Sequence, residues 1–299
     1  MFFLTMPTSV LVQNDSKIAH FFALLKFRLS AFVVFSGLFG YFIAETALQT
    51  DWKKVLIFTL GSFMITAAAN IINQMIEVRL DKVMKRTEGR PLPMGKISME
   101  EALILTVLMM IVGSALLFIF VNPLTAALTL FSLILYAFVY TPLKQISTVA
   151  VFVGAFPGAL PPLIGWVAAR GELHHYALLI FAVQFIWQFP HFWAIAWLGD
   201  EDYTKAGMKM LPKSGKSPAT ALHILTYNLF LVPIGLMPWY FGLSGIVSAI
   251  IATVMALLFM LPALELIRTG ERKAALKLMF ASFLYLPVVQ MAYYFDRLI

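Results

Sequence analysis

The chain has 299 residues, of which 61% are hydrophobic and 12% charged, whereas a soluble domain has about 45–50% apolar and about 25% charged residues. Several runs reach the roughly 20 apolar residues that a membrane span needs, which excludes a soluble enzyme, a secreted disulfide scaffold and a disordered regulator. The absence of cysteine excludes disulfides, thiolate metal sites and cysteine nucleophiles. Basic residues outnumber acidic ones by 22 to 15, an excess that in a membrane protein orients helices and does not indicate nucleic acid binding.

The apolar runs predict an all-α polytopic membrane protein with nine transmembrane helices in a single bundle. The runs are continuous rather than alternating, which disfavours membrane strands. No linker interrupts the chain, so we expect one transmembrane domain over residues 1–299. The predicted spans are 22–44, 55–76, 101–121, 124–142, 147–169, 176–198, 219–240, 244–266 and 275–294.

The third and fourth predicted spans meet at Asn122 and Pro123 with almost no polar linker. One helix of about 40 apolar residues would exceed the bilayer, so we expect a tight hairpin.

The basic residues predict how the helices are oriented. With a cytoplasmic N-terminus, the inner segments carry 18 of the 22 basic residues, as the positive-inside rule requires. The C-terminus then lies on the outer side. Residues 1–21 lack the features of a signal or transit peptide, which favours a bacterial inner membrane.

A polar stripe lies at the end of the second predicted helix. Asn73, Glu77 and Asp81 are four residues apart, so on a helix their side chains point in one direction. Such oxygen ligands suit Mg²⁺, which binds one or two carboxylates and completes its coordination with water and substrate phosphates. Basic residues follow directly, which would suit the remaining phosphate charge.

An alternative is a solvated helix end, in which Glu77 and Asp81 pair with Arg and Lys at helical spacing. Asn70 and Asn73 favour a functional site, because amide side chains within an apolar span usually face the bundle interior.

A second acidic cluster, Asp200, Glu201 and Asp202, follows the sixth predicted helix and precedes Tyr203 and Lys205. Two acidic clusters on one membrane face could hold two metal ions against one diphosphate. Charged loops are common, however, so the number of acids alone does not specify such a site.

His191 lies within the sixth predicted helix, between Pro190 and Phe192. Its surroundings allow three interpretations: a hydrogen-bonded core residue, a proton carrier or an iron ligand.

Two further segments stand out. Tyr140 to Lys144 ends the fourth predicted helix with a lone cation, and the Gly- and Pro-rich segment 154–163 is expected to break the fifth helix. Breaks of this kind are tolerated where the freed backbone faces protein or a cavity, which predicts a central cavity. Close packing of small residues at a helix crossing is the alternative.

Four ordered motifs now carry a family resemblance. They are the Asn73–Asp81 stripe with Arg-Thr-Glu-Gly-Arg-Pro-Leu at 86–92, Leu-Pro-Pro-Leu-Ile-Gly-Trp at 160–166, Gln-Phe-Pro-His-Phe-Trp-Ala at 188–194, and 202–212 with Asp-Tyr, Ala-Gly and Met-Leu-Pro. Together they resemble the intramembrane (UbiA-type) prenyltransferases, nine-helix enzymes that move an isoprenoid from its diphosphate to an aromatic or porphyrin acceptor. The chain is most similar to the branch that farnesylates haem B.

The resemblance implies a Mg²⁺-dependent enzyme that joins the farnesyl group of farnesyl diphosphate to a vinyl group of haem B, with addition of water, giving haem O. It implies catalytic roles for Asn73, Glu77, Asp81, His191 and Tyr203. The implied metal ligands are Asn73, Glu77, Asp81, Asp200, Glu201 and Asp202, and the implied diphosphate ligands are Arg86, Arg90, Lys144 and Lys205. Expected partners are the lipid bilayer and a haem A synthase or terminal oxidase assembly factors.

The chain departs from the family pattern at three places. Glu77 stands where Asp is usual, and Lys26-Phe27-Arg28 stands where Lys-Pro-Arg is common. The second acidic motif is offset, with His191 near the place of its first acid, which makes His191 a candidate for handling porphyrin or protons.

Two other functions stay open. One is a related prenyltransferase that acts on a quinone precursor such as a hydroxybenzoate or naphthoate. The other is a transporter that uses the buried amides and acids for ions. Acids at the cytoplasmic helix ends, rather than at the midplane, disfavour transport.

Overall fold

The computed structural model describes residues 16–45 and 50–298, and within these ranges it is helical with connecting loops and one isolated bridge. Nine helices in the described residues are long and apolar enough to cross a membrane, which confirms the predicted number. Residues 1–21, which the sequence analysis compared with signal and transit peptides, lie largely outside the described residues.

The spans agree with the predicted ones to within a few residues. They are α1 (Lys17–Leu24) with α2 (Phe27–Ala44), α3 (Trp52–Ile76), α5 (Met99–Phe120), α6 (Pro123–Ile134) with a π-helical segment (Leu135–Tyr140) and α7 (Thr141–Ile146), α8 (Ala150–Arg170), α9 (His175–Leu198), α11 (Pro218–Tyr240), α12 (Ile246–Thr269) and α13 (Arg272–Phe295). Two short helices, α4 (Val78–Asp81) and α10 (Asp200–Lys205), lie in the loops.

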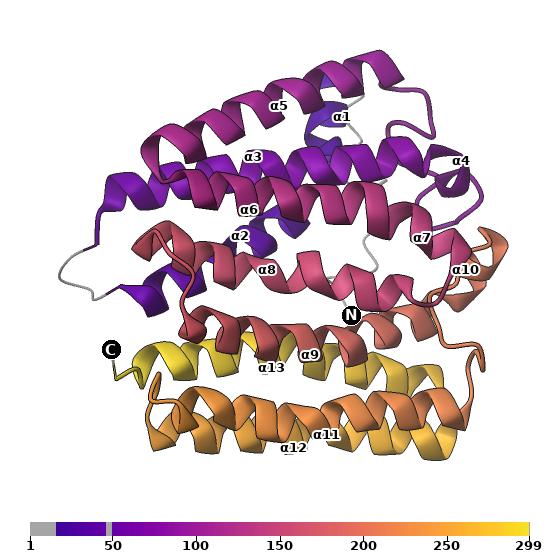
Figure 1. Ribbon diagram of the computed structural model, residues 1–299. Helices are drawn as coiled ribbons and strands as arrows, with labels where there is room; N and C mark the ends of the chain where they lie inside the picture. The colour runs from indigo at the N-terminus through magenta and orange to yellow at the C-terminus, as the bar shows by residue number, and fades with distance from the viewer. Residues whose placement is uncertain (1–15, 46–49, 299) are drawn as a thin grey trace.

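The long helices lie side by side in one bundle (Figure 1). From top to bottom in this view, α5, α3, α6, α8 and α9 follow one another, α13 lies at the level of α9, and α11 and α12 lie lowest. The short helices α4, α7 and α10 gather at one end, which we call the loop end, and the C-terminus lies at the opposite end.

The expected hairpin between the third and fourth spans is present. α5 ends at Phe120, and Asn122 caps α6 by accepting a hydrogen bond from the Thr125 N–H at 2.8 Å. The Asn122 amide also donates to the Val167 carbonyl at 3.0 Å, which ties the turn to α8. Pro123 at the start of α6 has no N–H to leave unsatisfied.

The expected break in the fifth span is wrong, because α8 is continuous over Ala150–Arg170 with Pro157, Pro161 and Pro162 inside it. A proline within a helix leaves the carbonyl four residues earlier without its donor. Pro162 frees the Gly158 carbonyl in this way, and the Gln184 amide of α9 donates to it at 2.8 Å. A polar side chain from the neighbouring helix therefore replaces the missing backbone bond.

Glycines bring α2 and α8 into backbone contact. A Cβ added to Gly165 would lie 1.8 Å from the Gly37 carbonyl oxygen, and one added to Gly40 would lie 1.8 Å from the Pro162 carbonyl oxygen. Segment 154–163 takes part in this close crossing through Pro162, as the packing alternative expected. The predicted central cavity stays a prediction.

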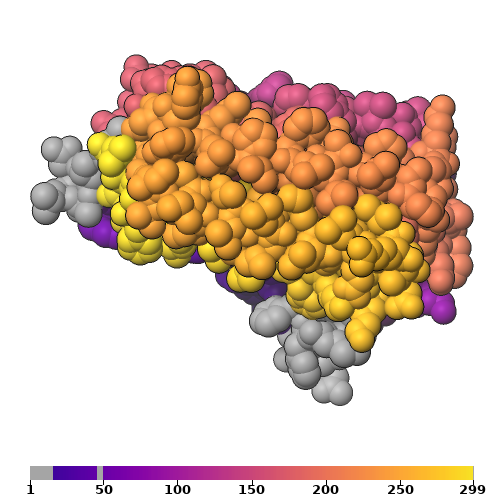
Figure 2. Space-filling model, turned by 90° about the horizontal axis from the view of Figure 1, so that it is seen from below, coloured from indigo at the N-terminus to yellow at the C-terminus, as the bar shows by residue number. Residues whose placement is uncertain are grey.

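The bundle's outer surface is apolar. Figure 2 shows the face formed by α11, α12 and α13, where exposed side chains include Leu229, Val254 and Leu261. Phe32 of α2 is 70% exposed, and Ile104 of α5 is 69% exposed. A surface of this composition is suited to lipid rather than water.

Candidate active site

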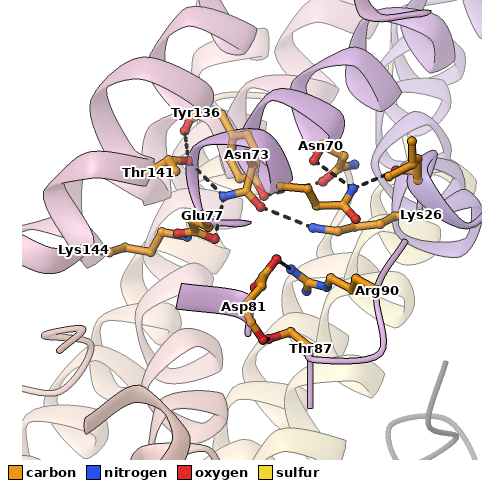
Figure 3. A network of polar contacts seen from close by, with 12 residues as sticks. Lys26, Asn70, Asn73, Glu77, Asp81, Thr87, Arg90, Tyr136, Thr141 and Lys144 are labelled. Atoms are coloured by element: carbon orange, nitrogen blue, oxygen red, sulfur yellow. Dashed lines mark hydrogen bonds and ion pairs between the residues drawn. The ribbon is translucent and has the colours of Figure 1, made fainter. Parts of the chain in front are cut away.

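The polar stripe lies where α3 ends. α3 stops at Ile76, Glu77 has φ −91° and ψ 7°, and Asp81 closes the short helix α4. The sequence predicted that the stripe lies on one continuous helix, and this prediction is wrong because the helix is interrupted at Glu77. The Glu77 N–H still donates to the Asn73 carbonyl at 3.0 Å, and the Asp81 N–H to the Glu77 carbonyl at 2.8 Å. Because this four-residue ladder continues across the break, the three side chains stay close together (Figure 3).

Each acid of the stripe is buried and paired with a cation from outside the stripe. An Arg90 guanidinium nitrogen donates to Asp81 Oδ2 at 2.7 Å, and Lys144 Nζ forms an ion pair with Glu77 Oε1. Asp81 is 0% exposed and Glu77 is 4% exposed. The alternative of a solvated helix end with pairs at helical spacing is therefore wrong.

We call this group, comprising Asn73, Glu77, Asp81, Arg90 and Lys144, the cradle (Figure 3). The Asn73 amide donates to Glu77 Oε2 at 2.9 Å and to Thr141 Oγ1 at 3.1 Å. Asn73 thereby connects α3 with α7 and orients the Glu77 carboxylate.

The cradle has an oxygen available for a further ligand. Asp81 Oδ1 is buried and has no hydrogen-bond partner in the described residues, although Oδ2 is bound to Arg90. A buried carboxylate oxygen without a partner is unfavourable unless a ligand completes it. The cradle therefore offers two carboxylates and one amide, a donor set that fits Mg²⁺.

The π-helical segment positions the cation of the fourth span. It extends over Leu135–Tyr140, and Thr141 Oγ1 donates back to the Tyr136 carbonyl at 2.8 Å. Lys144 Nζ lies 4.8 Å from the centre of the Tyr140 ring while pairing with Glu77. π-helical turns inside α-helices often occur at functional sites.

Asp202 of the second acidic cluster contacts the loop that follows α4 and carries Arg86 and Arg90. The Arg86 backbone N–H donates to Asp202 Oδ2 at 3.3 Å, and the Arg86 guanidinium lies 5.9 Å from the centre of the Tyr203 ring. These contacts join the loop after α4 to α10 at the loop end.

The other residues of this cluster point elsewhere. Asp200 Oδ2 lies 3.6 Å from Lys216 Nζ, and Glu201 lines a surface pocket with Lys216 and Arg272. Lys205 is exposed. Among the described residues, no hydrogen bond or ion pair joins Asp200, Glu201 or Lys205 to the cradle. Their metal and diphosphate roles stay predictions.

His191 is buried in the bundle on α9. Its Nδ1 lies 2.8 Å from Ser282 Oγ, and its ring stacks on Trp187 with centroids 4.5 Å apart. Because the Ser282 hydroxyl donates to the Met279 carbonyl, Ser282 Oγ accepts from His191 Nδ1–H. This assignment leaves the lone pair of the neutral imidazole on Nε2.

Comparison with known proteins shows the family of the chain. The model of the UbiA prenyltransferase family matches residues 33–286, which is most of the chain. The chain belongs to the UbiA prenyltransferase family.

Bacterial relatives of the UbiA family are similar over nearly the whole chain. A protoheme IX farnesyltransferase of Cytophaga hutchinsonii is 50% identical over 284 residues, covering 95% of this chain and 99% of the relative. One of Flavobacterium psychrophilum is 39% identical over 300 residues, covering 98% and 97%.

Solved UbiA-type structures share the fold. A digeranylgeranylglyceryl phosphate synthase superposes with a TM-score of 0.77 at 20% identity, covering 94% of this chain and 98% of that chain. A UbiA homologue from Archaeoglobus fulgidus bound to GPP and Mg²⁺ has a TM-score of 0.66 at 14% identity, covering 91% and 99%.

Two residues that contact the cradle, Lys26 and Thr141, were given no site role from the sequence. Lys26 Nζ donates to Asn73 Oδ1 at 3.3 Å, and Thr141 accepts from the same Asn73. The sequence offered a signal for each: Lys26 begins the Lys26-Phe27-Arg28 segment that stands where the family commonly has Lys-Pro-Arg, and Thr141 lies in the Tyr140–Lys144 segment.

Proposed function

We propose that this protein transfers the farnesyl group of farnesyl diphosphate to a vinyl group of haem B and adds water, giving haem O and diphosphate. The observation that carries the proposal is the 50% identity, over 95% of the chain, to a relative named protoheme IX farnesyltransferase. The cradle provides a chemical reason, since it is a buried polar site at one end of an apolar bundle.

The donor has a charged head and a long apolar tail. Its diphosphate would lie in the cradle at the loop end, and its tail would lie among the helices, where burial of apolar carbon is favourable. Arg90 and Lys144 are already in the cradle, and Arg86 lies above Tyr203 nearby. These cations would neutralise the diphosphate. Lys205 remains a predicted fourth cation.

The residues present fit the magnesium ion that this family implies. Asn73, Glu77 and Asp81 would hold it, because Asp81 Oδ1 is buried and has no partner among the described residues. When bound, Mg²⁺ would neutralise charge on the leaving diphosphate. Asp200, Glu201 and Asp202 are the proposed ligands of a second ion.

The reaction begins with the leaving group. The allylic C–O bond of farnesyl diphosphate breaks, and its electron pair leaves with the diphosphate, whose charge Arg86, Arg90 and Lys144 stabilise. The terminal carbon of the haem vinyl group bonds to C1 of the farnesyl group. Water then adds to the other vinyl carbon and loses a proton, which leaves a hydroxyl group.

His191 is the proposed acceptor of that proton. Its Nδ1–H is bound to Ser282, so Nε2 carries the free electron pair that a general base needs. Tyr203, whose ring centre lies 5.9 Å from the Arg86 guanidinium, is the alternative participant in this addition of water.

The chain's placement follows from its spans and relatives. Nine candidate spans in the described part of the chain make it a multi-pass membrane protein, and the relatives are bacterial. We propose the bacterial inner membrane, with the N-terminus and the loop end in the cytoplasm. A haem A synthase or terminal oxidase assembly factors would take up the product.

Purified protein offered two acceptors tests the proposal. Farnesyl diphosphate and Mg²⁺ are supplied with haem B or with a hydroxybenzoate, and products are identified by mass spectrometry. We expect only haem B to gain a farnesyl group and one water. A prenylated hydroxybenzoate with unchanged haem would instead identify a quinone-precursor enzyme. Unchanged acceptors would contradict prenyl transfer.

A further inference from the structure

The first span is broken at Lys26, between α1 and α2. Lys26 has φ 46° and ψ 50°, and within residues 16–45 and 50–298 it is the only non-glycine residue with a positive φ. The left-handed conformation is unfavourable for lysine because its Cβ crowds the backbone. Such a conformation persists only where the surrounding structure holds it, and it often marks a functional position.

Side chains of α2 and α3 hold this break. The Gln74 amide donates to the Leu24 carbonyl at 2.8 Å, and Ser30 Oγ donates to the Leu25 carbonyl at 2.8 Å. The Asn70 amide in turn donates to Ser30 Oγ at 3.1 Å. Gln74, Ser30 and Asn70 are all buried. Lipid offers no replacement for these bonds, so the polar side chains specify where the span breaks.

The break delivers Lys26 to the cradle. Its Nζ donates to Asn73 Oδ1 at 3.3 Å, and Figure 3 shows the side chain directed toward Asn73, opposite Lys144. With Lys26, three cations face the two carboxylates Glu77 and Asp81. The excess of positive charge suits an anionic ligand.

We propose that Lys26 is a further ligand of the substrate diphosphate, and that Asn70 and Gln74 are positioning residues that hold it there. This inference rests on the proposed function. In the structure Lys26 donates to a neutral amide oxygen, and a phosphate oxygen would be a stronger acceptor for its ammonium group. Asn70 and Gln74 act through the backbone at the break and touch no substrate.

Variants at Lys26 separate the charge from the backbone conformation. The full-length protein is titrated with inorganic diphosphate in the presence of Mg²⁺ and followed by calorimetry. Loss of the ammonium in Lys26→Met should weaken binding roughly tenfold, the usual worth of a hydrogen bond to a charged group. Lys26→Gly should weaken binding equally without lowering the thermal midpoint, because glycine adopts the left-handed conformation without strain.

A double-mutant cycle tests the positioning role. Gln74→Met should weaken diphosphate binding in the native background but not in Lys26→Met, since Gln74 acts through Lys26. Gln290→Met is the matched control: this buried glutamine bonds to Gln184 and Ser36, outside the cradle, and its loss should leave diphosphate affinity native.

The outcomes are distinguishable. If the native protein binds diphosphate and both Lys26 variants bind it equally well, the inference is overturned while the proposed function stands. Equal losses from Gln74→Met in both backgrounds would overturn the positioning role. A native protein that binds no diphosphate would overturn both the proposed function and the inference. Should Gln74→Met fail to fold, the two Lys26 variants still decide whether Lys26 binds the diphosphate.

Discussion

Glu77 and Lys144 form a buried ion pair in the cradle, and both have further contacts that fix their geometry. Taking two charges out of water is costly, so a buried pair is weak evidence of a purely stabilising role. The pair shares the cradle with Asp81, whose Oδ1 has no hydrogen-bond partner among the described residues, and this indicates a binding role instead. We therefore expect substitutions of Glu77 and Lys144 to change thermal stability and enzymatic activity independently of each other.

Lys144→Met should leave Glu77 charged and unpaired, which costs about 3–5 kcal/mol in comparable buried pairs. The thermal midpoint should fall, and the double variant Glu77→Gln with Lys144→Met should recover most of it. Haem farnesylation should stay lost in both, because the diphosphate loses a cation and the metal a carboxylate. Thermal unfolding and activity are measured on the same preparations, and an active double variant would contradict the assignment.

Metal removal should abolish turnover. We expect EDTA to stop farnesyl transfer and Mg²⁺ to restore it, while Ca²⁺ restores it poorly because it prefers more ligands at longer distances. The rate of haem farnesylation after dialysis into each metal gives the answer. Full activity in EDTA would contradict the proposed role of Mg²⁺ in farnesyl transfer.

At the scale of elements, the crossing of α2 and α8 depends on the absence of a side chain at Gly165. In Gly165→Ala the new Cβ would meet the Gly37 carbonyl, so the helices must separate. Overpacking of this kind typically costs about 1–3 kcal/mol, and the thermal midpoint should fall by several degrees.

Gly89→Ala is the control for this change, because an added Cβ there meets no atom within 4 Å. Its thermal midpoint should stay native. A native midpoint in Gly165→Ala would show that the crossing is looser than described.

The sequence predicted elements well where local signals agreed. Asn122 and Pro123 predicted the hairpin because their capping and first-turn preferences act within a few residues. The prediction of a helix break failed at α8. Pro162 leaves the Gly158 carbonyl without its backbone donor, and the replacement donor is Gln184, which lies 26 residues after Gly158. The break at Lys26 was missed for the same reason, since Asn70 and Gln74 follow it by more than 40 residues.

The candidate site was predicted in part. The four-residue spacing of Asn73, Glu77 and Asp81 identified the acidic side of the cradle, and the structure keeps these residues together. Which cation pairs with which acid could not be predicted, because Arg90 and Lys144 reach the cradle through tertiary packing.

At the scale of the whole molecule, the charge distribution predicts that the loop end faces the cytoplasm. The cysteine-free chain makes this easy to test, because any introduced thiol is unique. An impermeant thiol reagent should label Glu172→Cys in intact spheroplasts but label Glu88→Cys only after permeabilisation. Both side chains are exposed. The native chain is the unlabelled control, and the reverse pattern would invert the predicted topology.

The central claim is that the cradle at the loop end carries out farnesylation of haem B. The most direct measurement is mass spectrometry of haems extracted from cells that express either the native protein or Asp81→Asn, with equal amounts of each protein verified in the membrane. Asp296→Asn, which changes an acid at the opposite end, serves as the matched control. We expect haem O with the native protein and Asp296→Asn, and at least about 100-fold less with Asp81→Asn. Equal haem O from Asp81→Asn, or none from the native protein, would contradict the claim.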